Sequence, residues 1–150
     1  MEGRYQAGHE VETFTVMGIT VAVRASGDDT GGAYSLLEQT VPPGKGSPLH
    51  TLQDDKLIYV AEGEVAVTLG DTTRPVAAGG SALIPRGVPH NFANRGDRTA
   101  RILVVTSPGG HEGFMRGMGE LTAGGAPDRE RLAEHCALYG ARILPPAAAR

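Results

Sequence analysis

The chain has 150 residues, a net charge of −3 and 14 basic residues that are scattered rather than gathered into a stripe. This length fits a single domain with one core, and the charge pattern indicates neither nucleic acid nor a membrane surface as a partner. No apolar run reaches the roughly 18 residues that cross a bilayer. The amino-terminal residues contain no apolar signal segment and Cys136 has no second cysteine to pair with, so we expect a cytoplasmic protein that acts on a small molecule.

Short alternating segments rich in β-branched residues predict an all-β fold, and 22 glycines with 10 prolines predict frequent turns. In chain order we expect about ten strands, at residues 11–16, 18–25, 48–53, 56–69 around a turn at Glu62 and Gly63, 73–78, 81–84, 89–94 and 99–106, with an apolar run at residues 33–41. This spacing is typical of a β-sandwich or β-barrel.

Helix is expected mainly after residue 110. A mixed helical pattern begins at His111, and residues 128–139 predict a second helix with Asp128 as its cap and Gly140 as its stop. We therefore expect a β-barrel over residues 1–110 and a helical extension over residues 111–150 that packs on it within one domain. Cys136 lies on the apolar face of the second helix and should be a core residue.

Strand alternation places several reactive side chains on one inward face. Because side chains two apart point the same way in a strand, His50 and Leu52 should share a face, and Lys56 should share one with Ile58 and Val60. A later strand carries His90 and Phe92 on one side, and antiparallel pairing would bring His90 opposite His50. We expect Leu52, Ile58, Val60 and Phe92 to line an apolar pocket beside these polar groups.

Two spaced motifs carry a family resemblance. The segment GGSALIPRGVPHNFAN matches the second motif of the cupin superfamily at every fixed residue, which are Gly79, Pro85, Gly87, His90 and Asn94. The first cupin motif is matched at Gly44, His50 and Gly63. The chain resembles small single-domain cupins, and among them bacterial quercetin-dioxygenase-like proteins.

This resemblance implies a double-stranded β-helix barrel of jelly-roll type with a pocket at one end. Small cupins commonly form homodimers, and an edge strand at residues 11–16 would also need cover, so we expect a homodimer. The resemblance implies no single reaction, because cupins include dioxygenases, isomerases, epimerases, decarboxylases, polyketide cyclases and proteins that only bind.

The first motif departs from the family at two metal-ligand positions: Leu52 stands where the motif has His, and Lys56 where it has Glu. Two histidines, His50 and His90, fall short of the three protein ligands that most transition-metal sites need. We therefore expect no metal or other cofactor. The alternative is a reduced metal site in which Asp54, Asp55 or water completes the two histidines.

Lys56 is one of only two lysines beside twelve arginines, so a lysine at an inward position indicates a specific use. The competing interpretation is that its long stem reaches solvent and pairs with Asp54 or Asp55. We predict His50, Lys56 and His90 as the catalytic residues. His111 starts the first predicted helix near the barrel edge, and a place at the pocket mouth is the alternative to a purely structural role.

A buried cation can stabilise an enolate, carboxylate or phenolate while a histidine moves a proton, and a lysine in an apolar site can also act as a base or form an iminium. We predict metal-independent isomerisation, cyclisation or dehydration of an apolar carbonyl or polyketide-like substrate. The alternatives are a metal-dependent, quercetinase-like dioxygenase that uses His50 and His90, and a non-catalytic small-molecule binding protein.

Overall fold

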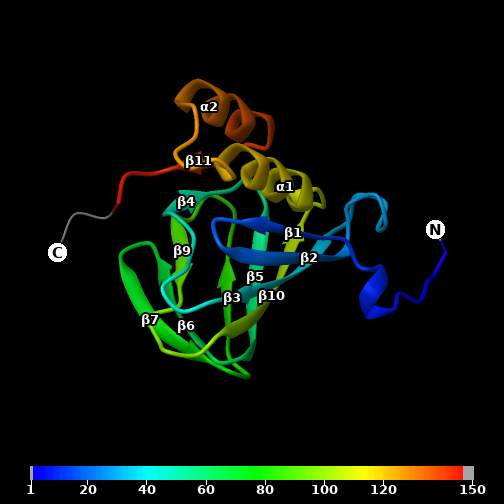
Figure 1. The fold of residues 1–150 in the computed structure, drawn as a ribbon, viewed down its shortest axis with the longest axis horizontal. Coiled ribbons are helices and arrows are strands. Elements are labelled where there is room, and N and C mark those ends of the chain that lie inside the picture. The colour runs from blue at the N-terminus through cyan, green and yellow to red at the C-terminus, as the bar shows by residue number, and fades with distance from the viewer. Residues whose placement is uncertain (1, 147–150) are drawn as a thin grey trace.

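The computed structural model describes residues 2–146, which form two antiparallel sheets that face one another (Figure 1). The six-stranded sheet has the order β1-β2-β3-β10-β5-β8 and the five-stranded sheet the order β11-β4-β9-β6-β7. The strands are β1 (Thr13–Val16), β2 (Ile19–Ala25), β3 (Ser35–Val41), β4 (His50–Thr51), β5 (Asp55–Glu62), β6 (Glu64–Leu69), β7 (Thr72–Ala77), β8 (Ser81–Ile84), β9 (His90–Ala93), β10 (Ala100–Ser107) and β11 (Arg142–Ile143).

The core is built by strand alternation. In β3 and β10 every second residue is buried, and in β5 the buried positions are Lys56, Ile58 and Val60. The antiparallel register places inward residues of neighbouring strands directly opposite one another: Ile102 of β10 pairs with Gln39 of β3 and with Val60 of β5. Each fully buried Val, Leu or Ile side chain contributes roughly 1.5–3 kcal/mol, so the two inward faces hold the barrel together.

The predicted fold class is confirmed: the chain is an antiparallel β-barrel with its α-helices after residue 110. Two details differ. The strand expected at residues 48–53 is only His50–Thr51, because the Leu52 carbonyl accepts a hydrogen bond from Gly87 N at 2.8 Å and the chain bends at residues 53–54. The two-residue strand β11 was not predicted; it pairs with β4 after Gly140.

Two helices, α1 (His111–Thr122) and α2 (Arg129–Leu138), lie together at one end of the barrel near β4 and β11 (Figure 1). Asp128 caps α2 as predicted, because its side chain accepts hydrogen bonds from the backbone of Glu130 and Arg131. Cys136 is buried, also as predicted. Within residues 2–146 no helix has both the length and the apolar character needed to span a membrane.

The helices pack closely because α1 presents glycines to α2. A Cβ atom at Gly113 would clash with the Tyr139 hydroxyl, and one at Gly117 would clash with the His135 ring. His135 lies flat against Phe114, with ring centroids 5.5 Å apart and an interplanar angle of 9°. One face of α1 is therefore occupied by the tail, while the opposite face is free to close the barrel.

Strand β1 forms one edge of the six-stranded sheet, where we expect a second copy of the chain to bind. An unprotected edge presents backbone donors and acceptors to any extended segment. Light scattering should therefore return about twice the 15.6 kDa chain mass. Leu83→Lys, on β8 at the opposite edge, should leave that mass unchanged. A monomeric mass at working concentration would contradict the expectation.

Candidate functional site

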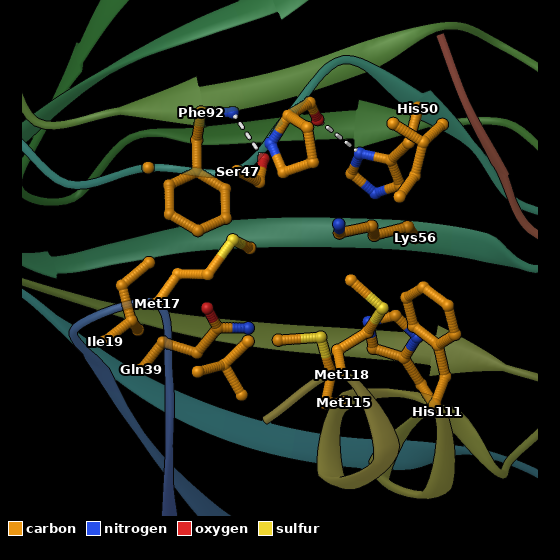
Figure 2. A pocket seen from close by; sticks show the side chains of 15 residues that line it. Met17, Ile19, Gln39, Ser47, His50, Lys56, Phe92, His111, Met115 and Met118 are labelled. Atoms are coloured by element: carbon orange, nitrogen blue, oxygen red, sulfur yellow. Dashed lines mark hydrogen bonds between the residues drawn. The ribbon is translucent and has the colours of Figure 1, made fainter. Parts of the chain in front are cut away.

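A cavity lies inside the barrel at the end covered by α1 (Figure 2). Its polar wall residues are Gln39, Ser47, His50, Lys56 and His111, and most of the remaining wall is apolar, including Met17, Phe92, Phe114, Met115 and Met118. The cavity volume is about 40 Å³. Drug-sized ligand pockets measure about 300–1,000 Å³, so a substrate of that size requires movement of the wall.

Lys56 enters the cavity from β5. Its register partners, Ile84 on β8 and Thr106 on β10, are also buried, which places all three side chains inside the barrel. Lys56 is only 3% exposed, and its Nζ lies 3.2 Å from His90 Nε2. The alternative in which its stem reaches solvent is therefore wrong, because the alternation of β5 directs this side chain inward.

The two aspartates before Lys56 lie elsewhere. Asp55 is exposed and forms an ion pair with Arg86, with 3.1 Å between Nη2 and Oδ2. Asp54 is half-buried, and burial raises the pKa of its carboxyl group. Neither residue is on the cavity wall. The sequence-based idea that one of them supplies the missing carboxylate ligand therefore finds no support in the geometry.

His50 and His90 face each other across β4 and β9, as the sequence predicted, with ring centroids 4.2 Å apart. The Nδ1 atom of each ring lies 2.8 Å from a carbonyl oxygen two residues earlier, that of Pro48 or of Val88. A carbonyl oxygen only accepts, so Nδ1 donates and Nε2 keeps its lone pair in each neutral ring. The lone pair of His90 accepts from Lys56, and that of His50 has no hydrogen-bond partner within residues 2–146.

His111, at the first position of α1, belongs to the same cluster. It is buried, and burial followed by the charges of Lys56 and His90 lowers its pKa to about 3. The sequence placed it near the barrel edge, with the pocket mouth as the alternative, because the direction in which a tail helix crosses a barrel depends on contacts far apart in the chain. The structure puts it on the cavity wall.

Burial sets the protonation states of the site. It lowers the pKa of Lys56 to about 8, with a small opposing effect from Asp54. Burial and then the Lys56 charge lower the pKa of His50 to about 2 and that of His90 to about 4. His50, His90 and His111 are therefore neutral at pH 7, although His90 itself is not on the cavity wall. Lys56 is the member of the cluster that changes charge closest to neutral pH.

The cluster is a poor match for a transition metal. His90 Nε2, the atom that would bind a metal, accepts from the Lys56 ammonium. Among residues 2–146, no three His, Cys, Asp or Glu side chains converge closely enough to hold an ion. Most catalytic zinc and iron sites use three protein ligands. The donor atoms present therefore do not fit a resident metal.

The predicted apolar lining needs correction. Phe92 is on the cavity wall, but Leu52, Ile58 and Val60 pack in the hydrophobic core beside it. Strand alternation identifies the residues that point inward, but it does not show whether such a residue lines the cavity or lies in the core. The rest of the cavity wall comes from α1 and the β1–β2 turn. Gln39 was missed, although a glutamine at an inward position of the apolar segment SLLEQTV was a usable signal.

The comparisons with known proteins agree with the fold. Residues 37–106 match a family model described as a cupin domain. The barrel has the cupin fold. Over 54 residues the chain is 37% identical to protein SchB of Streptomyces halstedii, a match that spans 36% of this chain and only 39% of SchB.

Solved structures extend the match along the barrel. The polyketide cyclase RemF of Streptomyces resistomycificus is 29% identical, with a TM-score of 0.62 over 71% of this chain and 80% of RemF. KdgF from a Halomonas species has a TM-score of 0.66 over 74% of this chain and 98% of KdgF, but at 18% identity it supports the cupin fold alone. The narrower resemblance to quercetin-dioxygenase-like proteins stays a prediction.

Proposed function

We propose that this cupin is an enzyme that transfers protons without a metal, isomerising, cyclising or dehydrating an apolar carbonyl or polyketide-like substrate. The observation that carries the proposal is Lys56, a titratable ammonium buried in an apolar cavity and hydrogen-bonded to a histidine. The likeness to RemF, a polyketide cyclase at 29% identity, supports the substrate class.

In this proposal Lys56 binds the substrate oxygen. As a proton leaves the carbon next to a carbonyl group, negative charge develops on the carbonyl oxygen, and a fixed ammonium in a dry cavity stabilises it far better than water does. His90 is a positioning residue, because its Nε2 accepts from Nζ and fixes the direction of the ammonium. The remaining N–H bonds of Lys56 are then available to the substrate.

His50 is the proposed base. Its unoccupied Nε2 takes the proton from carbon, the carbon–hydrogen electron pair becomes that of the enolate, and the protonated ring, which can exchange its proton with solvent, returns a proton at carbon or oxygen. Burial, and after it the Lys56 charge, lower the pKa of His50. An anionic oxygen on Lys56 offsets that charge, so the basicity of His50 rises as the enolate forms.

Entry of a ring-sized substrate requires the cavity to widen. Met17, Met115 and Met118 stand on the wall, and unbranched methionine side chains rearrange more readily than branched ones. Met17 is 40% exposed, in the turn between β1 and β2, so it marks the side where the cavity is nearest to solvent. The enlarged pocket would remain apolar, with its polar groups gathered at Lys56.

Exchange of carbon-bound hydrogen tests this chemistry without knowledge of the natural substrate. In D₂O, chelator-treated protein should accelerate the exchange of the acidic hydrogens of 2-tetralone, which NMR follows directly, because the site supplies a base and a cation for the enolate. Exchange that appears only after iron, zinc, nickel or manganese is added would contradict the proposal. Binding of 2-tetralone without exchange would instead indicate a non-catalytic binding protein.

A further inference from the structure

Gln39 is a buried amide that the proposed chemistry does not use. It lies in the middle of β3, is 1% exposed and is on the cavity wall. Its Oε1 has no hydrogen-bond partner within residues 2–146. Its neighbours across the sheet, Val21 on β2 and Ile102 on β10, offer no polar side chain. A buried acceptor without a partner is costly, which indicates that something other than the fold keeps it there.

The register places Gln39 far from Lys56. Lys56 is level with Thr106 and Ser35, whereas Gln39 is four residues further along β3 and two strands away from β5. With about 3.3 Å per residue and about 4.8 Å between strands, the two backbone positions are roughly 16 Å apart. Figure 2 shows the two side chains entering the cavity from different walls, with the side chains of Met115 and Met118 nearby. A molecule that touches both must reach from one wall of the cavity to the other.

We propose that Gln39 is a specificity-determining residue whose amide binds an oxygen function at the far end of the substrate. This inference rests on the proposed function, in which Lys56 holds the first oxygen. The substrate class is then a mostly apolar molecule with oxygen functions at both ends, long enough to span the cavity from Lys56 to Gln39. An amide donates and accepts, so a hydroxyl group can use both of its hydrogen-bonding capacities on Gln39.

Two aromatic carboxylates that differ by one hydroxyl group test this directly: 2-naphthoate and 6-hydroxy-2-naphthoate. The carboxylate serves as the anion for Lys56, and calorimetry gives each dissociation constant. The wild-type protein should prefer the hydroxylated ligand by about tenfold. Gln39→Met keeps the side-chain length but removes the amide, and should reduce that preference to within about twofold while 2-naphthoate still binds.

Thr106→Val is the matched control. Thr106 also has a buried oxygen without a partner, but it is not on the cavity wall, so its variant should keep the hydroxyl preference. Gln39→Met should also raise the melting temperature by about 2–4 °C, because it removes an unsatisfied group from the interior. A lower melting temperature with the preference intact would mean that Gln39 supports the fold instead, and would overturn the proposal.

Lys56→Met separates this inference from the proposed function. If that variant weakens both naphthoates but Gln39→Met keeps the hydroxyl preference, the inference is wrong and the role of Lys56 stands. If Gln39→Met removes the preference while Lys56→Met binds both ligands like wild type, the inference stands and the anion-binding role of Lys56 fails. Failure of both naphthoates to bind the wild-type protein overturns both.

Discussion

Lys56→Met should abolish the exchange reaction and at the same time make the protein more stable. The variant keeps most of the stem volume and deletes the charge that holds the developing enolate, so exchange should fall by roughly 1,000-fold or to background. At pH 7 the buried ammonium destabilises the fold because burial lowers its pKa from 10.5 to about 8. Removing it should raise the free energy of unfolding by on the order of 3 kcal/mol.

The pH dependence gives this prediction a second measurement. Between pH 8 and 10.5 the unfolded chain binds more protons at Lys56 than the folded chain, so wild-type stability rises with pH across that range. The gain from Lys56→Met should therefore shrink above pH 8 and vanish near 10.5. Binding of 2-naphthoate to the wild type should weaken as the pH passes through about 8, because Lys56 loses its charge.

Lys45→Met is the matched control, since it makes the same change at the other lysine of the chain. Lys45 is exposed and is not on the cavity wall, so neither exchange nor stability should change much. Thermal or urea unfolding at several pH values measures the stability, and NMR measures the exchange. A Lys56→Met protein that still exchanges at the wild-type rate would remove Lys56 from the mechanism.

Lys56→Glu should convert the cluster into a metal site. The substitution places a carboxylate beside the Nε2 atoms of His50 and His90 and removes the ammonium that occupies His90. Two neutral imidazoles and one carboxylate form a common three-ligand set for zinc and iron. Zn²⁺ affinity, measured by calorimetry, should rise by roughly 1,000-fold or more over wild type, because the site gains a third ligand and loses its positive charge.

Lys56→Gln separates the gain of a third ligand from the loss of the positive charge. It removes the ammonium without supplying a carboxylate, so its Zn²⁺ affinity should stay well below that of Lys56→Glu. Co²⁺ gives a spectroscopic check, because tetrahedral coordination produces strong visible absorption that Lys56→Gln should lack. Equally tight Zn²⁺ binding by the wild-type protein would show that the ammonium does not keep metal out, and the proposed absence of a metal would be wrong.

Motif spacing predicted the centre of the site because its residues lie on short paired strands with a fixed alternation. His50, Lys56 and His90 come together inside the barrel as a result. The sequence alone did not assign Gln39 or His111 to the cavity wall, for different reasons. Gln39 needed the register of β3 against β10 to place it on the cavity wall. His111 needed the path of α1 across the barrel, which long-range packing determines.

The depth of apolar residues was also beyond the sequence. Alternation put Leu52, Ile58 and Val60 on the inward face, where they are buried, but it could not tell wall from core. That distinction depends on where α1 and the β1–β2 turn close the end of the barrel. Both close it through contacts between segments far apart in the chain, which a local pattern does not contain.

The glycine face of α1 leaves one part of the cavity wall free to vary independently of the reactive groups. Lys56, His50 and His90 are on strands, whereas Met115 and Met118 are on a helix that rests on α2 through Gly113 and Gly117. The Met115 and Met118 side chains can therefore be exchanged without altering either the strand register or the packing of α1 against α2, in which Phe114 takes part by stacking on His135. A library confined to Met115 and Met118 would vary the shape of accepted molecules while the proton-handling groups stay in place.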